Sequence, residues 1–123
     1  MDIYSENILD HYQHPHNQGE ITDRTVRVFE NNPLCGDTIQ MDLKIKGDKI
    51  TEIAFVGNGC AISQAASSLL SDEIKGKKVS ALKKMKTQKV YDLLQVPISP
   101  GRVKCALLGY ATLQSALKNI GTK

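Results

Sequence analysis

The first half of the chain contains stretches in which apolar and polar residues alternate, a period that is typical of half-buried β-strands. The alternation is clearest over residues 38–46, where Ile39, Met41, Leu43 and Ile45 share one face of an extended chain. A continuous polar surface on the other face is expected to meet solvent. Strands are therefore predicted at residues 25–30, 38–46 and 49–57, with a tight turn at 47–48 between the last two.

After Cys60 the apolar residues recur at helical spacing instead. Between residues 61 and 75 they stand at i, i+3, i+4, i+7 and i+8, which predicts an amphipathic helix that ends before Gly76. A leading helix, three strands and then several helices predict an α+β fold, with a small three-stranded antiparallel sheet and helices packed on one face. The remaining helices are expected at residues 2–12, 79–85, 88–95 and 102–119.

The length and composition indicate how many domains the chain forms and in which cellular compartment it is expected. With 123 residues, of which 41% are hydrophobic and 24% charged, the chain is expected to form a single domain over residues 1–123. The N-terminus lacks the basic and then apolar pattern of a secretory signal, and no apolar run approaches the roughly 20 residues of a membrane span. We therefore expect a cytoplasmic protein with no membrane partner.

The net charge of +3 reflects a local excess of lysine. Seven lysines fall between Lys75 and Lys89, with no acidic residue between Glu73 and Asp92. Such a stretch is either a solvated face or a surface that attracts an acidic partner. No aromatic residue interleaves the lysines to stack on bases, so a nucleic-acid partner is not expected.

The candidate chemistry lies in three cysteines, Cys35, Cys60 and Cys105. An odd number of thiols in a reducing compartment argues against a disulfide framework. Their gaps of 25 and 45 residues exclude a Cys-x-x-Cys zinc knuckle. A lone cysteine is ordinarily a small hydrophobic residue, so the local context of each thiol has to decide its role.

That context favours a metal or cluster site. Cys35 and Cys60 stand next to glycines, which let a backbone approach a bound ion, and Cys60 and Cys105 fall at predicted helix N-termini, which favour the thiolate. Asp37 projects on the same side of an extended segment as Cys35. Three thiolates and one carboxylate form a tetrahedral donor set suited to zinc or to the irons of a small iron–sulfur cluster. Because a carboxylate is a poorer ligand for a cluster than sulfur is, the site suits a cargo that is held for a time and passed on.

Three motifs, "NNPLCGDTIQMDLKI", "FVGNGCAISQAASS" and "GRVKCALL", together with the leading "YSENILDHYQHPHNQGEI", resemble the U-type iron–sulfur assembly proteins. This family comprises IscU, SufU and the N-terminal part of NifU, and the resemblance covers essentially the whole chain. It implies a scaffold or sulfur-acceptor role rather than an enzyme, with a cysteine desulfurase and apo iron–sulfur acceptor proteins as partners. It also implies a transient [2Fe–2S] cluster or Zn²⁺ as cofactor. Carried over by position, the site residues are Cys35, Asp37, Cys60 and Cys105.

The sequence departs from both main branches of the family. IscU-type members carry a histidine directly before the last cysteine, within a Leu-Pro-Pro-Val-Lys stretch read by a chaperone, whereas this chain has Lys104 there, as SufU does. SufU-type members carry an insertion of about twenty residues before that motif, an uncommon loop length in a compact domain, and this chain lacks it. Two functions therefore remain possible: a cluster scaffold, and a zinc-dependent sulfurtransferase that works with the desulfurase. Whether a chaperone is a partner is also left open. A structural zinc module is the less favoured reading, because such sites are usually closed Cys/His sets.

The sulfur acceptor is expected to be a thiolate that can reach outward. Cys35, on a loop beside Asp37, is the candidate persulfide acceptor. Cys105 is the alternative, because Arg102 and Lys104 stand close to it and either favour its thiolate or simply face water.

Several other polar residues are interpreted as structural. The histidines of "HYQHPH" form a tract of the kind that binds metal, but surface side chains are the expectation for them. The small residues of "SQAASS" are expected to allow close helix packing. Solvated positions are expected for His11, His14, His16, Asp42 and Asp48.

Overall fold

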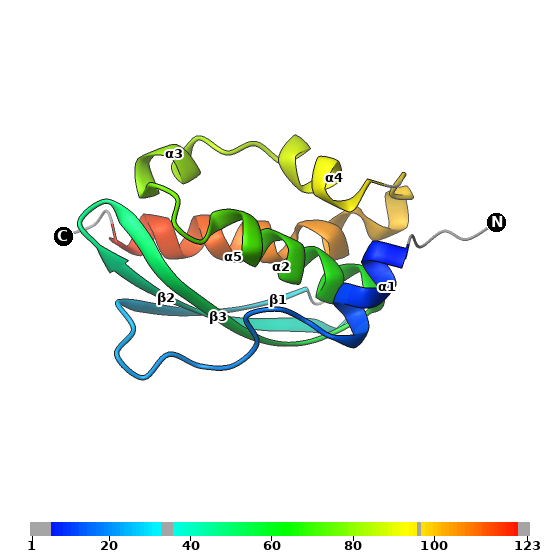
Figure 1. The fold of residues 1–123 in the computed structure, drawn as a ribbon. Coiled ribbons are helices and arrows are strands. Elements are labelled where there is room, and N and C mark those ends of the chain that lie inside the picture. Colours follow the sequence, from blue (N-terminus) through cyan, green and yellow to red (C-terminus); the bar gives the residue numbers. More distant parts are fainter. Residues whose placement is uncertain (1–5, 33–35, 96, 121–123) are drawn as a thin grey trace.

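The computed structural model describes residues 6–32, 36–95 and 97–120, and within them a three-stranded antiparallel sheet carries helices on one face (Figure 1). This confirms the predicted α+β fold. Helices α2 and α5 contact the sheet directly, and α3 and α4 pack on these two helices. The elements are α1 (Glu6–Gln13), β1 (Val26–Asn32), β2 (Asp37–Lys46), β3 (Lys49–Asn58), α2 (Ala61–Ile74), α3 (Val79–Lys83), α4 (Gln88–Leu94), the short 3-10 helix η1 (Pro100–Arg102) and α5 (Val103–Ile120).

The sheet has the order β1-β2-β3, and its register places the alternating apolar residues together. Met41 is paired with Val28 on one side and with Phe55 on the other, and all three are buried. This row lies beneath α2 and α5 in the larger of two apolar clusters. A register shift between Lys44 and Ile45 bends β2 near its end. The apolar residues that alternate in the sequence therefore form the face of the sheet on which the helices pack.

The two central helices approach each other closely. A β-carbon on Gly109 of α5 would lie 2.8 Å from Oγ and 3.3 Å from Cα of Ser67 in α2, so a glycine is needed at this crossing. Ser63, Ser67 and Ser68 of the "SQAASS" helix are buried. The small residues of α2 thus serve close packing, as expected from the sequence.

The face of the sheet away from the helices is partly covered by the segment 17–25, which crosses it between α1 and β1 (Figure 1). This segment also pairs with the outer edge of β3, where Gly19 and Asn17 exchange backbone hydrogen bonds with Phe55. The prediction that Asp42 is solvated is wrong, because only 1% of this residue is exposed. Its carboxylate accepts hydrogen bonds from Arg27 and from the backbone N–H of Ile21 in the covering segment.

The expectation of surface histidines is wrong for His11 and right for His14 and His16. His11 is buried because α1 lies against α2, where its Nδ1 is 2.6 Å from Oγ of Ser68. The side chain of His16 is about half exposed. The packing of α1 on α2 therefore buries one histidine of the tract and leaves the other two exposed.

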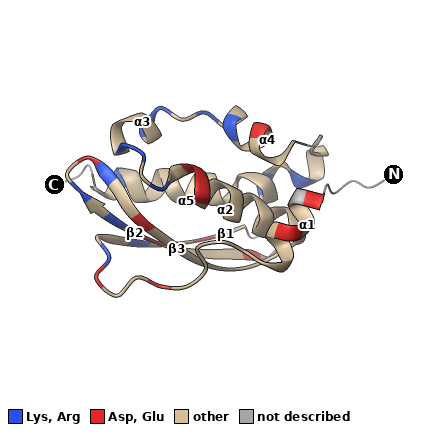
Figure 2. Cartoon of the chain, in the orientation of Figure 1, with Lys and Arg blue, Asp and Glu red and all other residues tan. Residues whose placement is uncertain are grey.

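The lysine-rich stretch follows the exposed side of α3 and the connection to α4 (Figure 2). Lys77 and Lys89 approach the carboxylate of Glu73 at 3.6 Å and 3.4 Å. Most of the stretch is thus exposed and has local ion pairs, which agrees both with a solvated face and with a surface for an acidic partner. Among the described helices, none has the length and apolarity that crossing a bilayer requires.

Candidate metal centre

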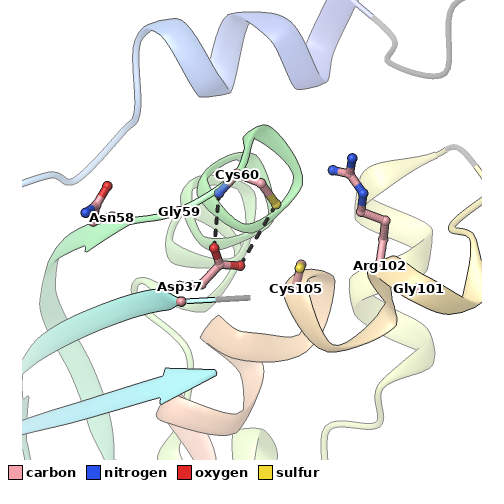
Figure 3. A pocket seen from close by; sticks show the side chains of 8 residues that line it. Asp37, Asn58, Gly59, Cys60, Gly101, Arg102 and Cys105 are labelled. Atoms are coloured by element: carbon pink, nitrogen blue, oxygen red, sulfur yellow. Dashed lines mark hydrogen bonds between the residues drawn. The ribbon is translucent and has the colours of Figure 1, made fainter. Parts of the chain in front are cut away.

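Three elements bring a carboxylate and two thiols to one end of the sheet (Figure 3). Asp37 is the first residue of β2, Cys60 is the N-cap of α2, and Cys105 lies in the first turn of α5. Strand pairing explains this meeting, since Thr38, next to Asp37, is paired with Asn58, two residues before Cys60. The chain thus places its donors where a strand begins and two helices begin.

One ligand atom from each of Asp37, Cys60 and Cys105 lies within 4.8 Å of the other two. Asp37 is 3% exposed and Cys105 is 4% exposed, whereas Cys60 is half-buried. The carboxylate accepts a hydrogen bond of 3.3 Å from the backbone N–H of Cys60 and faces the Cys60 thiol, with 4.0 Å between Oδ2 and Sγ. Cys35, the remaining residue of the predicted set, lies outside the described residues.

Gly59 determines where the carboxylate sits. A β-carbon at this position would lie 2.6 Å from Oδ1 of Asp37 and 2.5 Å from Oγ of Ser63, distances that real β-carbons do not show. Only glycine therefore lets the backbone before α2 pass over the carboxylate. The sequence shows the glycine beside Cys60 but not its contact with Asp37, because this contact depends on the pairing of β2 with β3.

The three donors line an open pocket of about 500 Å³. Arg102 also lines it, and its side chain extends beside the two thiols in Figure 3. Lys104, the other cation expected near Cys105, lines a separate pocket of about 290 Å³ with Asn31 and Leu107. The remaining lining residues of the thiol pocket are Gly36, Asn58, Gly59 and Gly101.

The chemistry of this donor set fits a zinc ion or cluster iron. Thiolates are preferred ligands of both, and Cys60 stands at the N-cap of α2 with its thiol facing the pocket. Asp37 adds an anionic oxygen that Gly59 keeps in place. The pocket is open to solvent on one side, as a site that loads and releases a cargo requires and as a closed structural zinc site does not.

The chain belongs to the family of the NifU-like N terminal domain, whose model matches residues 3–123. The family resemblance predicted from the sequence is thereby confirmed.

Named relatives cover nearly the whole chain. It is 35% identical to the zinc-dependent sulfurtransferase SufU of Bacillus subtilis, over 94% of this chain and 89% of that protein. It is 34% identical to the iron–sulfur cluster assembly scaffold protein IscU of Thermotoga maritima, over 96% of this chain and 94% of that protein. Its identity to these two proteins is therefore nearly the same.

Solved structures give the same picture. A putative iron–sulfur cluster assembly scaffold protein for the SUF system from Fervidobacterium islandicum superposes with a TM-score of 0.81 at 32% identity, covering 94% of this chain and 96% of that one. A NifU-like N-terminal protein from Brucella abortus superposes with a TM-score of 0.83 at 21% identity, covering 98% and 96%, and supports the fold alone.

Proposed function

We propose that this protein assembles a transient [2Fe–2S] cluster from iron and from sulfur supplied by a cysteine desulfurase, and passes the cluster to apo-proteins in the cytoplasm. The observation that carries the proposal is the convergence of Asp37, Cys60 and Cys105, with ligand atoms within 4.8 Å, in a pocket open to solvent. Membership of the NifU-like family and the names of its scaffold relatives support the same role.

In this role the protein holds its cargo with side chains from three elements. The thiolates of Cys60 and Cys105 and the carboxylate of Asp37 are the described donors, and Cys35 is the proposed fourth. Asp37 is the hard ligand of the set, and its contacts with Cys60 keep it next to the thiols before any cargo arrives. Because oxygen holds cluster iron less firmly than sulfur does, Asp37 is the ligand expected to yield when the cluster leaves.

Sulfur enters by thiol–persulfide exchange. The acceptor thiolate attacks the outer sulfur of the desulfurase persulfide, the S–S bond to the desulfurase cysteine breaks, and that cysteine leaves as a thiolate. We propose Cys35 as the acceptor, with Cys105 as the alternative. Cys105 is only 4% exposed and lies in an apolar cluster with Ile62 and Ala106, so an outward movement of its thiol would disturb this packing.

A zinc-dependent sulfurtransferase is the second candidate function. Two observations favour it: the 35% identity to the protein of that name from Bacillus subtilis, and a lysine, Lys104, directly before Cys105. In this case zinc would occupy the same donors, and the protein would act as an enzyme together with the desulfurase.

Metal analysis of the purified protein, followed by anaerobic incubation with ferrous iron, cysteine, a desulfurase and a dithiol reductant, tests the two functions. The dithiol supplies the two electrons that convert each persulfide sulfur into the sulfide of the cluster. A scaffold is expected to gain the visible absorption of a cluster, with equal iron and acid-labile sulfide, and to activate an apo-protein. Cys60→Ser and Cys105→Ser should abolish the signal, whereas the control Gly101→Ala, in the same pocket but with open space around it, should retain it. If the protein binds zinc, stimulates desulfurase turnover and forms no cluster, it is a sulfurtransferase rather than a scaffold. Complete unfolding when a chelator removes the metal would instead indicate a structural zinc module.

The acceptor is identified separately by Cys→Ala variants at the three cysteine positions. Persulfide on each variant is mapped by mass spectrometry after reaction with the desulfurase, and turnover is measured in parallel. We expect Cys35→Ala to lose the persulfide. Normal sulfur acceptance by Cys35→Ala, with loss in Cys105→Ala, would assign the role to Cys105.

A further inference from the structure

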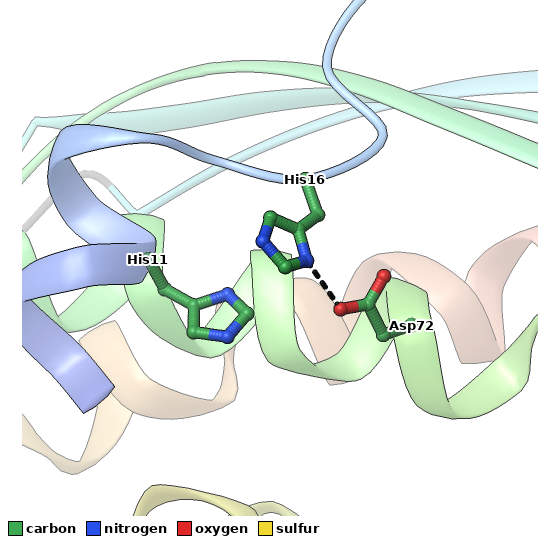
Figure 4. Close-up of side chains that lie close together, drawn as sticks. All are labelled: His11, His16 and Asp72. Carbon is green, nitrogen blue, oxygen red and sulfur yellow. Dashed lines mark hydrogen bonds and ion pairs between the residues drawn. The ribbon is translucent and has the colours of Figure 1, made fainter.

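A second group of metal-binding side chains lies on the opposite half of α2 from the thiols. His11 of α1, His16 of the following loop and Asp72 of α2 each offer one ligand atom, and these three atoms lie within 4.8 Å of one another (Figure 4). Asp72 stands twelve residues after Cys60, which corresponds to about 18 Å along the axis of α2. The group is therefore distinct from the thiol pocket.

Residues of α2 hold the two histidines in place. Ser68 and Asp72 are one helical turn apart and face the same way from α2. The Ser68 hydroxyl lies 2.6 Å from Nδ1 of His11 and accepts a hydrogen bond of 2.8 Å from the backbone N–H of His16. One buried serine thus fixes the ring of the first histidine and the backbone of the second.

The carboxylate is held in the same manner. Asn17 has a φ of 56°, a left-handed conformation that asparagine tolerates, and this reverses the chain directly after His16. Its side-chain amide donates hydrogen bonds of 2.8 Å to Oδ1 of Asp72 and to Oγ of Ser71. The other oxygen, Oδ2, is 2.5 Å from Nδ1 of His16. Both Asp72 oxygens are therefore oriented, and one of them faces the imidazoles.

The two imidazole rings come from different parts of the chain but lie side by side. His11 is buried against α2, whereas His16 is half exposed in the loop that follows α1. The two rings are already close, with centroids 4.4 Å apart and planes inclined by 47°.

We propose that His11, His16 and Asp72 form a second metal site, which binds a divalent first-row transition-metal ion through two imidazoles and one carboxylate. This donor set is harder than the thiol pocket and leaves open positions around the ion, as in two-histidine, one-carboxylate sites for ferrous iron and in zinc sites with three protein ligands. The ion replaces the hydrogen bond between His16 and Asp72, and it ties α1 and its loop to α2. The serine and asparagine contacts are the outer support that such ligands usually have.

Cobalt(II) titration of the full-length protein tests the proposal, because the two sites give different signals. Thiolate-bound cobalt has intense near-ultraviolet charge-transfer absorption, whereas a nitrogen and oxygen site does not. The protein is therefore first saturated with one equivalent of zinc, the ion that thiolates prefer, and cobalt is then added while the ring resonances of the three histidines are followed by NMR. We expect a further equivalent of cobalt to bind and to broaden the signals of His11 and His16 before that of His14.

Three variants complete the test. His16→Gln and Asp72→Asn remove ligands at half-exposed positions and should weaken this second binding step by at least about tenfold, without changing zinc binding by the thiols. His14→Gln is the matched control from the same tract and should leave the affinity unchanged, because His14 is exposed and not one of the three ligands. Circular dichroism verifies that each variant is folded. The proposal would be overturned if cobalt broadened the signals of all three histidines equally. It would also be overturned if His14→Gln lost as much cobalt affinity as the ligand variants, or if both ligand variants kept the parent affinity.

Discussion

Two buried aspartates on the same strand have opposite surroundings. Asp42 receives hydrogen bonds of 2.7 Å and 2.9 Å from the guanidinium of Arg27 and one of 2.9 Å from the backbone N–H of Ile21. Asp37, five residues earlier and on the other face of β2, meets the backbone N–H of Cys60 at 3.3 Å and its thiol sulfur at 4.0 Å. The first carboxylate is matched by a fixed cation, and the second stands among thiols that carry negative charge when they bind metal.

The difference separates stability from function. A buried carboxylate is tolerated when charge-assisted hydrogen bonds compensate for its lost hydration, as they do at Asp42. At Asp37 the contacts with Cys60 place the carboxylate beside the two thiols, where a metal cation bound in the proposed function would add charge compensation of its own. We therefore expect variants of Asp42 to lose stability and variants around Asp37 to lose metal binding.

The largest effect is expected for Asp42→Ala. Removing the carboxylate leaves the buried N–H of Ile21 without its acceptor, so the free energy of unfolding should fall by about 2–3 kcal/mol. Urea denaturation measures this loss, and zinc binding by the thiols should be unchanged at a temperature where the variant is folded. Asp37→Ala is the reciprocal control, with weakened zinc binding and a smaller loss of stability. A comparable loss of metal affinity in Asp42→Ala would remove the distinction between the two carboxylates.

Acid should weaken the protein through Asp42 by a smaller amount. Burial raises the pKa of Asp42, but the hydrogen bonds from Arg27 and Ile21 outweigh burial and lower the pKa of this carboxyl from its usual value. A carboxyl with a lowered pKa in the folded state contributes stability above the unfolded value of about 3.9, and the contribution is lost as the pH falls through the folded pKa. The difference in unfolding free energy between the parent and Asp42→Asn should therefore be constant near neutrality and shrink below about pH 4. A difference that is independent of pH would show that charge contributes nothing to the pair.

The smallest of the three effects, and the most local, is expected for Gly59→Ala. Its methyl group would displace the Asp37 carboxylate and the Ser63 hydroxyl, so zinc affinity should fall by about tenfold, with a stability loss of about 1 kcal/mol from overpacking. Competition with a chromophoric chelator measures the affinity. Gly101→Ala, in the same pocket with nothing within 4 Å of the added carbon, is the matched control. Equal affinities of the two variants would mean that the position of the carboxylate is unimportant for metal binding.

The fold was predictable from local patterns, because the strands and α2 carry periodic apolar residues that all face the same core. The approach of Cys60 and Cys105 to Asp37 could be expected in outline, since strand ends and helix starts meet at one edge of such a sheet. The burial of Asp42 and His11 could not, because it is caused by a non-periodic segment and by the docking of a short helix. Neither leaves a pattern in the sequence. The requirement for glycine at residue 59 likewise depends on strand register, which no local signal specifies.

The pairing of the outer edge of β3 also affects how readily the protein aggregates. An exposed strand edge is a template on which another chain can add a strand, which is how many sheet proteins begin to aggregate. Here the middle of that edge is occupied by Asn17 and Gly19, and its start by Gly76 and Lys77 through backbone hydrogen bonds to Ile50. In the proposed function the protein meets a desulfurase and apo-proteins repeatedly. Because these parts of the edge are already paired within its own chain, they are not available for non-specific strand addition during such encounters.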